Sequence, residues 1–141
     1  MFSTRGRYAL RIMLDLAEHR NGGFIPLRDV AERQEISLKY IERIMASLSR
    51  DGLVEGMHGK GGGYRLVKDP ADVSALDVLR SAEGELAPVA CLECGARPCP
   101  RAADCRTLPM WKRFDELTQD YFASVKLSEL MRGDPSNEYV I

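Results

Sequence analysis

Apolar residues in the first third of the chain recur with the spacing of amphipathic α-helices. The pattern predicts three helices, over residues 5–18, 27–34 and 37–50. Asn21-Gly22-Gly23 separates the first two helices, whereas only a brief turn separates the second from the third. Ser37 is placed to cap the third helix. A short helix, a tight turn and a longer helix are the arrangement of a helix-turn-helix.

The third predicted helix separates into an apolar face and a polar face. Its buried stripe is expected to consist of Leu38, Ile41, Met45 and Leu48. The opposite face is expected to carry Lys39, Tyr40, Arg43, Ser47 and Arg50, with Glu42 on its flank. Many surface helices show such a pattern without binding anything. The preceding short helix and turn favour a helix that enters the major groove of DNA.

The next segment strengthens this interpretation. Residues 53–57 and 64–67 have strand character and flank a glycine-rich tip, His58-Gly59-Lys60-Gly61-Gly62-Gly63. A β-hairpin after a helix-turn-helix predicts a winged helix, so the expected fold class is mainly α with a small β-hairpin wing. Lys60 and Arg65 can meet phosphates or a minor groove. A nucleotide-binding loop is excluded because neither glycine-rich nucleotide motif is present.

The second half of the chain predicts two more helices. Ser74 is placed to cap a helix that ends near Glu83, and Pro109 to start a long helix over residues 110–124. The long helix carries an apolar stripe made of Met110, Phe114, Leu117, Tyr121 and Val125, with Trp111 and Phe122 beside it. This surface either packs on the chain's own core or pairs across a homodimer. We expect the homodimer, because winged-helix proteins commonly bind two half-sites.

All four cysteines, Cys91, Cys94, Cys99 and Cys105, lie in one loop with the spacing C-x2-C-x4-C-x5-C. In a reducing compartment such a cluster favours metal or redox chemistry over disulfides. Structural zinc sites usually pair two short knuckles, and only Cys91 and Cys94 form one. An iron–sulfur cluster tolerates irregular spacing within one loop, and Pro98 and Pro100 flank Cys99 as in ferredoxin loops. Spacing alone favours iron–sulfur modestly and leaves zinc open.

Composition and charge narrow the class of protein. With 141 residues and 45% hydrophobic positions, the chain suits one small domain with an appended element. Residues 1–69 carry a net charge of +3, from 12 Lys and Arg against 9 Asp and Glu, and residues 70–141 carry −4. A basic first half suits a polyanionic partner. With neither a signal peptide nor an apolar run of roughly 20 residues, the chain is expected to be cytoplasmic and not in a membrane.

Taken together, these residues resemble the family of winged-helix transcription regulators that includes IscR, NsrR and CymR. The likeness covers nearly the whole chain. The motifs that carry it are Arg5-Gly6-Arg7-Tyr8-Ala9, Met13-Leu14-Asp15, Ile36-Ser37-Leu38-Lys39-Tyr40-Ile41-Glu42, Gly52-Leu53-Val54, Gly59-Lys60-Gly61-Gly62-Gly63-Tyr64, and Cys105 followed by Trp111. The resemblance implies a homodimer on palindromic promoter DNA, whose affinity changes when an iron–sulfur cluster is lost, oxidised or nitrosylated.

The resemblance also implies site residues. Cys91, Cys99 and Cys105 match three cysteine ligands of a cluster, in either its two-iron or its four-iron form. The fourth ligand departs from the family. Leu108 stands where cluster-biogenesis regulators have histidine, and Arg7 or Tyr8 where nitric-oxide sensors have aspartate. Cys94 is the expected replacement and Glu93 the runner-up. The residues expected to bind DNA are Arg28, Ser37, Lys39, Tyr40, Glu42, Arg43, His58, Lys60, Gly61, Gly62 and Gly63, with His58 where some relatives have a minor-groove arginine.

The sequence therefore predicts a dimeric repressor that is not an enzyme and that reports redox state, nitric oxide or iron–sulfur status. Its expected parts are a winged helix-turn-helix DNA-binding domain over 1–84, a cluster-binding loop over 85–108, a dimerisation helix over 109–132 and a tail over 133–141. Three alternatives stay open: a zinc or thiol-redox switch in place of the cluster, a winged-helix module that binds only protein, and a thiol oxidoreductase using Cys91 and Cys94. The oxidoreductase is disfavoured because no βαβ pattern surrounds that pair.

Overall fold

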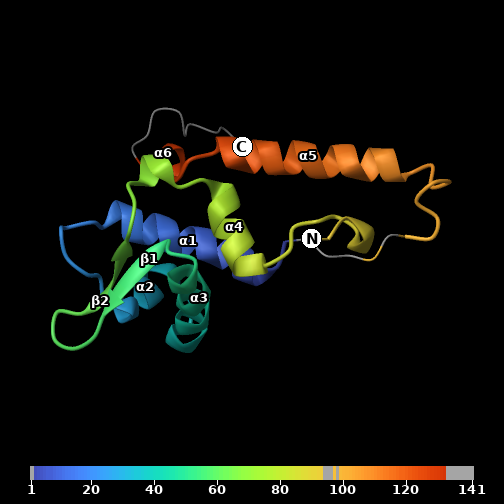
Figure 1. Cartoon of the computed structure of the whole chain (residues 1–141). Coiled ribbons are helices and arrows are strands. Elements are labelled where there is room, and N and C mark those ends of the chain that lie inside the picture. Colours follow the sequence, from blue (N-terminus) through green and yellow to red (C-terminus); the bar gives the residue numbers. More distant parts are fainter. Residues whose placement is uncertain (1, 94–96, 98, 133–141) are drawn as a thin grey trace.

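A computed structural model describes residues 2–93, 97 and 99–132 of the chain. Its helices are α1 (Thr4–Glu18), α2 (Leu27–Gln34), α3 (Leu38–Arg50), α4 (Ala75–Glu83), α5 (Leu108–Ser124) and α6 (Leu127–Leu130), its strands are β1 (Val54–Met57) and β2 (Gly63–Leu66), and its 3-10 turns are η1 (Pro70–Asp72) and η2 (Ala90–Leu92). Helices α1 to α4 and the hairpin form a head, from which α5 extends as an arm (Figure 1). None of the described helices is long and apolar enough to cross a membrane.

The head is built around α1, which packs against α2, α3 and α4. Side chains from these helices and the hairpin close one core, whose completely buried members include Ile12, Met13, Leu16, Ile41, Ile44, Met45 and Leu48. Strands β1 and β2 pair antiparallel, in a register from Val54 opposite Leu66 to Met57 opposite Gly63. A helix-turn-helix followed by a two-stranded hairpin is a winged helix, so the predicted fold class is confirmed.

The buried face of α3 differs from the prediction at two positions. Ile44, which the predicted stripe omits, is completely buried, while Leu38 is 42% exposed. The prediction that Leu38 faces the core is wrong. Leu38 is the first residue of α3, and the core on that side ends at the half-buried ring of Tyr40, which packs against Tyr8 with 5.8 Å between ring centroids. The apolar spacing of α3 therefore includes Leu38, although the core ends before it reaches this side chain.

The predicted apolar stripe of the long helix is not covered by the head. No residue of α5 is buried, and Met110, Phe114, Leu117 and Tyr121 are 44% to 60% exposed. The chain then returns to the head through α6, which no pattern in the sequence predicts. Leu127 is completely buried there, and its amide donates to the carbonyl of Val73 at 2.9 Å. A helix of four residues is too short to show a periodic pattern.

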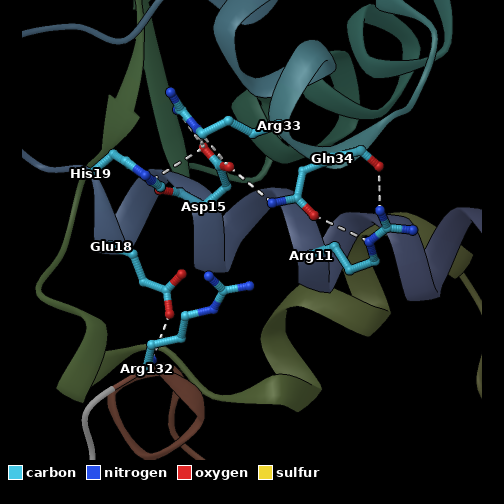
Figure 2. A network of polar contacts seen from close by, with 7 residues as sticks. All are labelled: Arg11, Asp15, Glu18, His19, Arg33, Gln34 and Arg132. Atoms are coloured by element: carbon cyan, nitrogen blue, oxygen red, sulfur yellow. Dashed lines mark hydrogen bonds and ion pairs between the residues drawn. The ribbon is translucent and has the colours of Figure 1, made fainter.

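A buried carboxylate joins α1 to the helix-turn-helix. Asp15 is only 1% exposed, and the guanidinium of Arg33 donates to both its oxygens, Nη2 to Oδ1 at 2.7 Å and Nε to Oδ2 at 3.0 Å (Figure 2). The amide of Gln34 donates to Oδ2 at 2.9 Å. Burial raises the pKa of Asp15, but these hydrogen bonds and the charges of Arg33 and His19 bring it below its ordinary value. Asp15 therefore stays ionised in the core.

Replacing Asp15 should destabilise the head, because the change leaves Arg33 and Gln34 without their acceptor. We expect Asp15→Ala to lower the free energy of unfolding by about 2–3 kcal/mol, measured by urea denaturation at pH 7. The matched control is Arg20→Ala, which removes an exposed ion pair with Asp69 at 3.7 Å and should change stability by less than about 0.5 kcal/mol. Equal effects of the two variants would contradict the role of Asp15.

The same pair predicts a pH dependence. Because folding lowers the pKa of Asp15, its contribution is fully present above the ordinary carboxyl pKa of about 4 and is lost as pH falls through the folded value. The wild-type protein should therefore lose more stability on acidification from pH 6 than Asp15→Asn does.

Candidate nucleic-acid interface and cysteine loop

The exposed face of α3 carries a row of basic side chains. Lys39, Arg43 and Arg50 follow i, i+4, i+11 spacing and are all exposed, and exposed Ala46 lies between them. The small side chain of Ala46 leaves room for a surface to approach the helix backbone. Glu42 is exposed on the flank, as predicted. A straight basic row of this kind suits the phosphates and base edges of a nucleic acid.

Two contacts fix the start of α3. Ser37 caps the helix, accepting the amide hydrogen of Tyr40 at 3.2 Å, as the sequence predicts. The sequence predicts that Tyr40 faces outward. Its ring is instead half-buried against Tyr8. The guanidinium of Arg11 lies 5.1 Å from the Tyr8 ring centroid and also donates to the Gln34 side chain at 3.2 Å and to its backbone carbonyl. Helix α1 thus holds both sides of the turn before α3.

The glycines of the wing have a structural role. A side chain at Gly63, where φ is +148°, would collide with the carbonyl of Ile25, and one at Gly62 would collide with the carbonyl of Met57. Ile25 and Tyr64 exchange two backbone hydrogen bonds, at 2.8 and 2.9 Å, which dock the hairpin on the segment before α2. These glycines therefore set the wing's position. DNA contact by Gly61, Gly62 and Gly63 stays a prediction.

Some cationic side chains of the head are paired with other side chains of the protein, and others are not. Arg65 donates to Glu55 at 2.7 Å, and its guanidinium lies 4.3 Å from the ring centroid of Phe24, so it is held within the wing. Several other cations make no ion pair or side-chain hydrogen bond within the described part of the chain, namely Arg28, Lys39, Arg43 and Lys60. His58 is exposed near the wing tip. These four cations are among the residues predicted from the sequence to bind DNA, and their contact with DNA stays a prediction.

The cysteine loop leaves the end of α4 and reaches the start of α5 at the end of the arm farthest from the head (Figure 1). Cys91 lies in η2 and is exposed, as is Cys99, while Cys105 is partly exposed before α5; all three are free thiols. Cys94 lies outside the described residues. In the described ranges no three Cys, His, Asp or Glu side chains gather as a metal site. Within those ranges Cys91, Cys99 and Cys105 do not form such a group, and their role as ligands stays a prediction.

The thiol chemistry nevertheless suits a soft metal. The Thr107 hydroxyl and the Cys105 sulfur are 3.5 Å apart, and this side-chain hydrogen bond lowers the pKa of Cys105. The backbone amides of Thr107 and Leu108 add to this effect. These amides belong to the start of α5. Thiolates are the donors that iron–sulfur clusters and zinc prefer. The donor types therefore fit a cluster or zinc.

Some residues that connect the parts of the molecule are not predicted from the sequence. Asp15, Arg33 and Gln34 are one such set, and a sign was present, because Asp15 follows Ile12 by three positions on the apolar face of α1. Glu83 is another, since its carboxylate accepts from the amide and the hydroxyl of Ser3, at 2.7 and 2.8 Å. It ties the start of α1 to the point where the cysteine loop begins. No local pattern indicates a pair 80 residues apart.

Comparison with known proteins agrees with this architecture. The profile of the Rrf2 family, described as an iron-dependent transcriptional regulator, matches residues 2–133. A helix-turn-helix transcriptional regulator of Neisseria meningitidis serogroup A is 36% identical over 130 residues, covering 92% of this chain and 86% of that protein. IscR of Photorhabdus laumondii is 34% identical over 131 residues, covering 93% and 79%. The solved structure of CymR, the global cysteine regulator of B. subtilis, aligns with a TM-score of 0.73 and 32% identity over 92% of this chain and 95% of that one.

These similarities decide between the classes left open by the sequence. The relatives are transcriptional regulators and not enzymes, which confirms the predicted class and removes the oxidoreductase alternative. The family match also spans the head, the cysteine loop and the arm, so it does not depend on the winged helix alone. The chain belongs to the Rrf2 family of winged-helix transcriptional regulators, and it is a DNA-binding regulator of the IscR and CymR type.

Proposed function

We propose that the protein is a homodimeric repressor whose affinity for promoter DNA is set by an iron–sulfur cluster bound to its cysteine loop. The observation that carries the DNA-binding part is the exposed basic row of α3, whose members Lys39 and Arg43 have no partner in the described part of the chain. Phosphate contacts from such cations supply sequence-independent affinity, and contacts to base edges supply specificity. Arg28 of α2 and Lys60 of the wing are further exposed cations.

Arg43 is the arginine of this row nearer to the N-terminal end of α3, and an arginine there can donate two hydrogen bonds to a guanine edge. On DNA that the protein selects from a library of random duplexes, Arg43→Ala should weaken binding by about 1–3 kcal/mol. The measurement is a fluorescence anisotropy titration at matched salt. Arg113→Ala is the control, since Arg113 lies on α5 and pairs with Glu116 at 3.3 Å. Unchanged DNA affinity in Arg43→Ala would contradict a contact between Arg43 and DNA.

The homodimer rests on the apolar stripe of α5. Met110, Phe114, Leu117 and Tyr121 project from an arm that the head leaves uncovered. Contiguous exposed apolar surface of this kind marks an interface. Antiparallel packing of two copies of α5 would bury both apolar stripes. The resulting dimer would carry two copies of α3, one for each half-site of a palindrome.

A charge in the middle of the stripe should prevent this pairing. Leu117→Glu is expected to convert the dimer to a monomer at micromolar concentration, measured by sedimentation velocity, because dimerisation would desolvate the new carboxylate. Asp120→Ala, on an exposed position of the same helix, should leave the dimer intact. A dimeric Leu117→Glu protein would contradict an interface on this stripe.

The cluster would be held by Cys91, Cys99 and Cys105, with Cys94 as the fourth ligand and Glu93 as runner-up. Support comes from three free thiols on one loop and from the lowered pKa of Cys105, which favours the thiolate. A bound cluster supplies a centre that reacts with oxidants and nitric oxide. The chain's own contribution is the connection of the loop to the DNA-binding head, through Glu83 and Ser3 at one end and α5 at the other.

Protein purified without oxygen should be coloured and contain iron and acid-labile sulfide, measured by colorimetric assay and absorption spectroscopy. Cys105→Ala should lose both, because a ligand is removed, while Cys94→Ala should lose them only if Cys94 is the fourth ligand. Ser49→Ala, on α3, serves as the control variant and should keep them. Colourless wild-type protein with stoichiometric zinc would overturn the cluster in favour of the zinc switch.

A further inference from the structure

Leu38 is an apolar side chain that lies on the surface and takes no part in the hydrophobic core. It is the first residue of α3 and is 42% exposed, although the neighbouring helix positions Ile41 and Met45 are completely buried. Its exposed neighbours are Lys39, next in the chain, and Glu42, one turn along the helix. An apolar group thus lies among charged groups on the outer surface of α3.

The contacts at the start of α3 keep Leu38 on that surface. Ser37 holds the first turn through its hydrogen bond from the amide of Tyr40, and Tyr40 packs against Tyr8. With Tyr40 half-buried and Ile41 completely buried, the rotation of the helix is fixed. Leu38 cannot turn into the core without breaking these contacts, so its exposure is a consequence of the fold.

A single exposed leucine is ordinary on a protein surface, and Val67, 49% exposed, is an example elsewhere on the head. The position of Leu38 sets it apart. In a helix-turn-helix, the N-terminal residues of the second helix contact base edges in the major groove. The apolar feature of those base edges is the C5-methyl group of thymine. An aliphatic side chain at this point has one matching partner in the groove.

We propose that Leu38 is a specificity-determining residue that packs on the methyl group of a thymine in each half-site. The inference rests on the proposed DNA-binding function and adds to it a base preference. Arg43 and Lys39 would bind through charge and hydrogen bonds, and neither distinguishes thymine from uracil. Leu38 would supply a contact that depends on the methyl group alone. Removing either the leucine side chain or the methyl group should therefore have the same effect.

The test replaces thymines by deoxyuridine one position at a time in DNA selected by the wild-type protein from random duplexes. Deoxyuridine keeps base pairing and removes only the methyl group. At one position in each half-site, the change should weaken wild-type binding by about fourfold, the effect of exposing one apolar carbon. Leu38→Ala should bind thymine and deoxyuridine at that position equally well, and alanine is well tolerated in a helix. Val67→Ala is the control and should keep the fourfold difference.

The outcomes separate this inference from the function on which it rests. Wild-type protein that selects a sequence but tolerates deoxyuridine at every position overturns the role of Leu38 and leaves DNA binding intact. A fourfold difference that persists in Leu38→Ala also overturns it, because another residue then contacts the methyl group. Wild-type protein that enriches no sequence and binds duplexes without salt dependence overturns the DNA-binding function and this inference with it.

Discussion

Asp15 sits at the buried contact between α1 and α2, and an ionised carboxylate is costly there unless its oxygens are fully paired. Arg33 and Gln34 supply that pairing from the last turn of α2, directly before the turn that leads to α3. The geometry of this one group therefore fixes how the short helix lies on α1. Arg11 adds a second attachment at the same turn, and the Tyr8–Tyr40 contact adds a third at the start of α3. The direction of the basic row follows from these constraints.

Helix α1 also contacts the chain at both ends of the segment that holds the cysteine loop and the arm. Glu83 joins its start to the end of α4, where the cysteine loop begins. At its other end, the carboxylate of Glu18 accepts the amide of Arg132 at 2.5 Å, just after α6 (Figure 2). The loop and the arm are thus attached to the same helix that orients α3. Under the proposed function, a change in the loop that displaced α4 or α5 would act on α3 through α1.

Much of the fold was predictable because it rests on local signals. Helical periodicity gave α1, α2, α3 and α5, capping by Ser37 and Ser74 gave the starts of α3 and α4, and glycine-rich spacing gave the hairpin. The exposed cations of α3 were predictable for the same reason. Contacts between residues far apart in the sequence were not predictable. Neither the Glu83–Ser3 pair nor the Leu127–Val73 pair has a local sequence pattern that indicates it.

The errors have a related cause. Leu38 fits the apolar spacing of α3, yet it lies beyond the edge of the core. The position of that edge depends on residues from other helices, such as Tyr8 of α1. Long-range contacts escape the pattern in the same way, since Glu55 from the paired strand and Phe24 from a distant loop hold Arg65. The predicted contact of Arg65 with phosphates or a minor groove stays a prediction. The convergence of the cysteines stays a prediction, because spacing states which donors exist and not where the loop places them.

The central claim is that the state of the cysteine loop controls DNA affinity. The most direct test measures, without oxygen, the affinity of one coloured preparation for its selected DNA before and after treatment with a nitric-oxide donor at constant salt. The account predicts that the affinity changes by about tenfold or more, in the range of coupling energies of about 1–3 kcal/mol, and that Cys105→Ala protein gives the same affinity before and after. An unchanged affinity in the wild-type protein, with loss of colour verified, would contradict it.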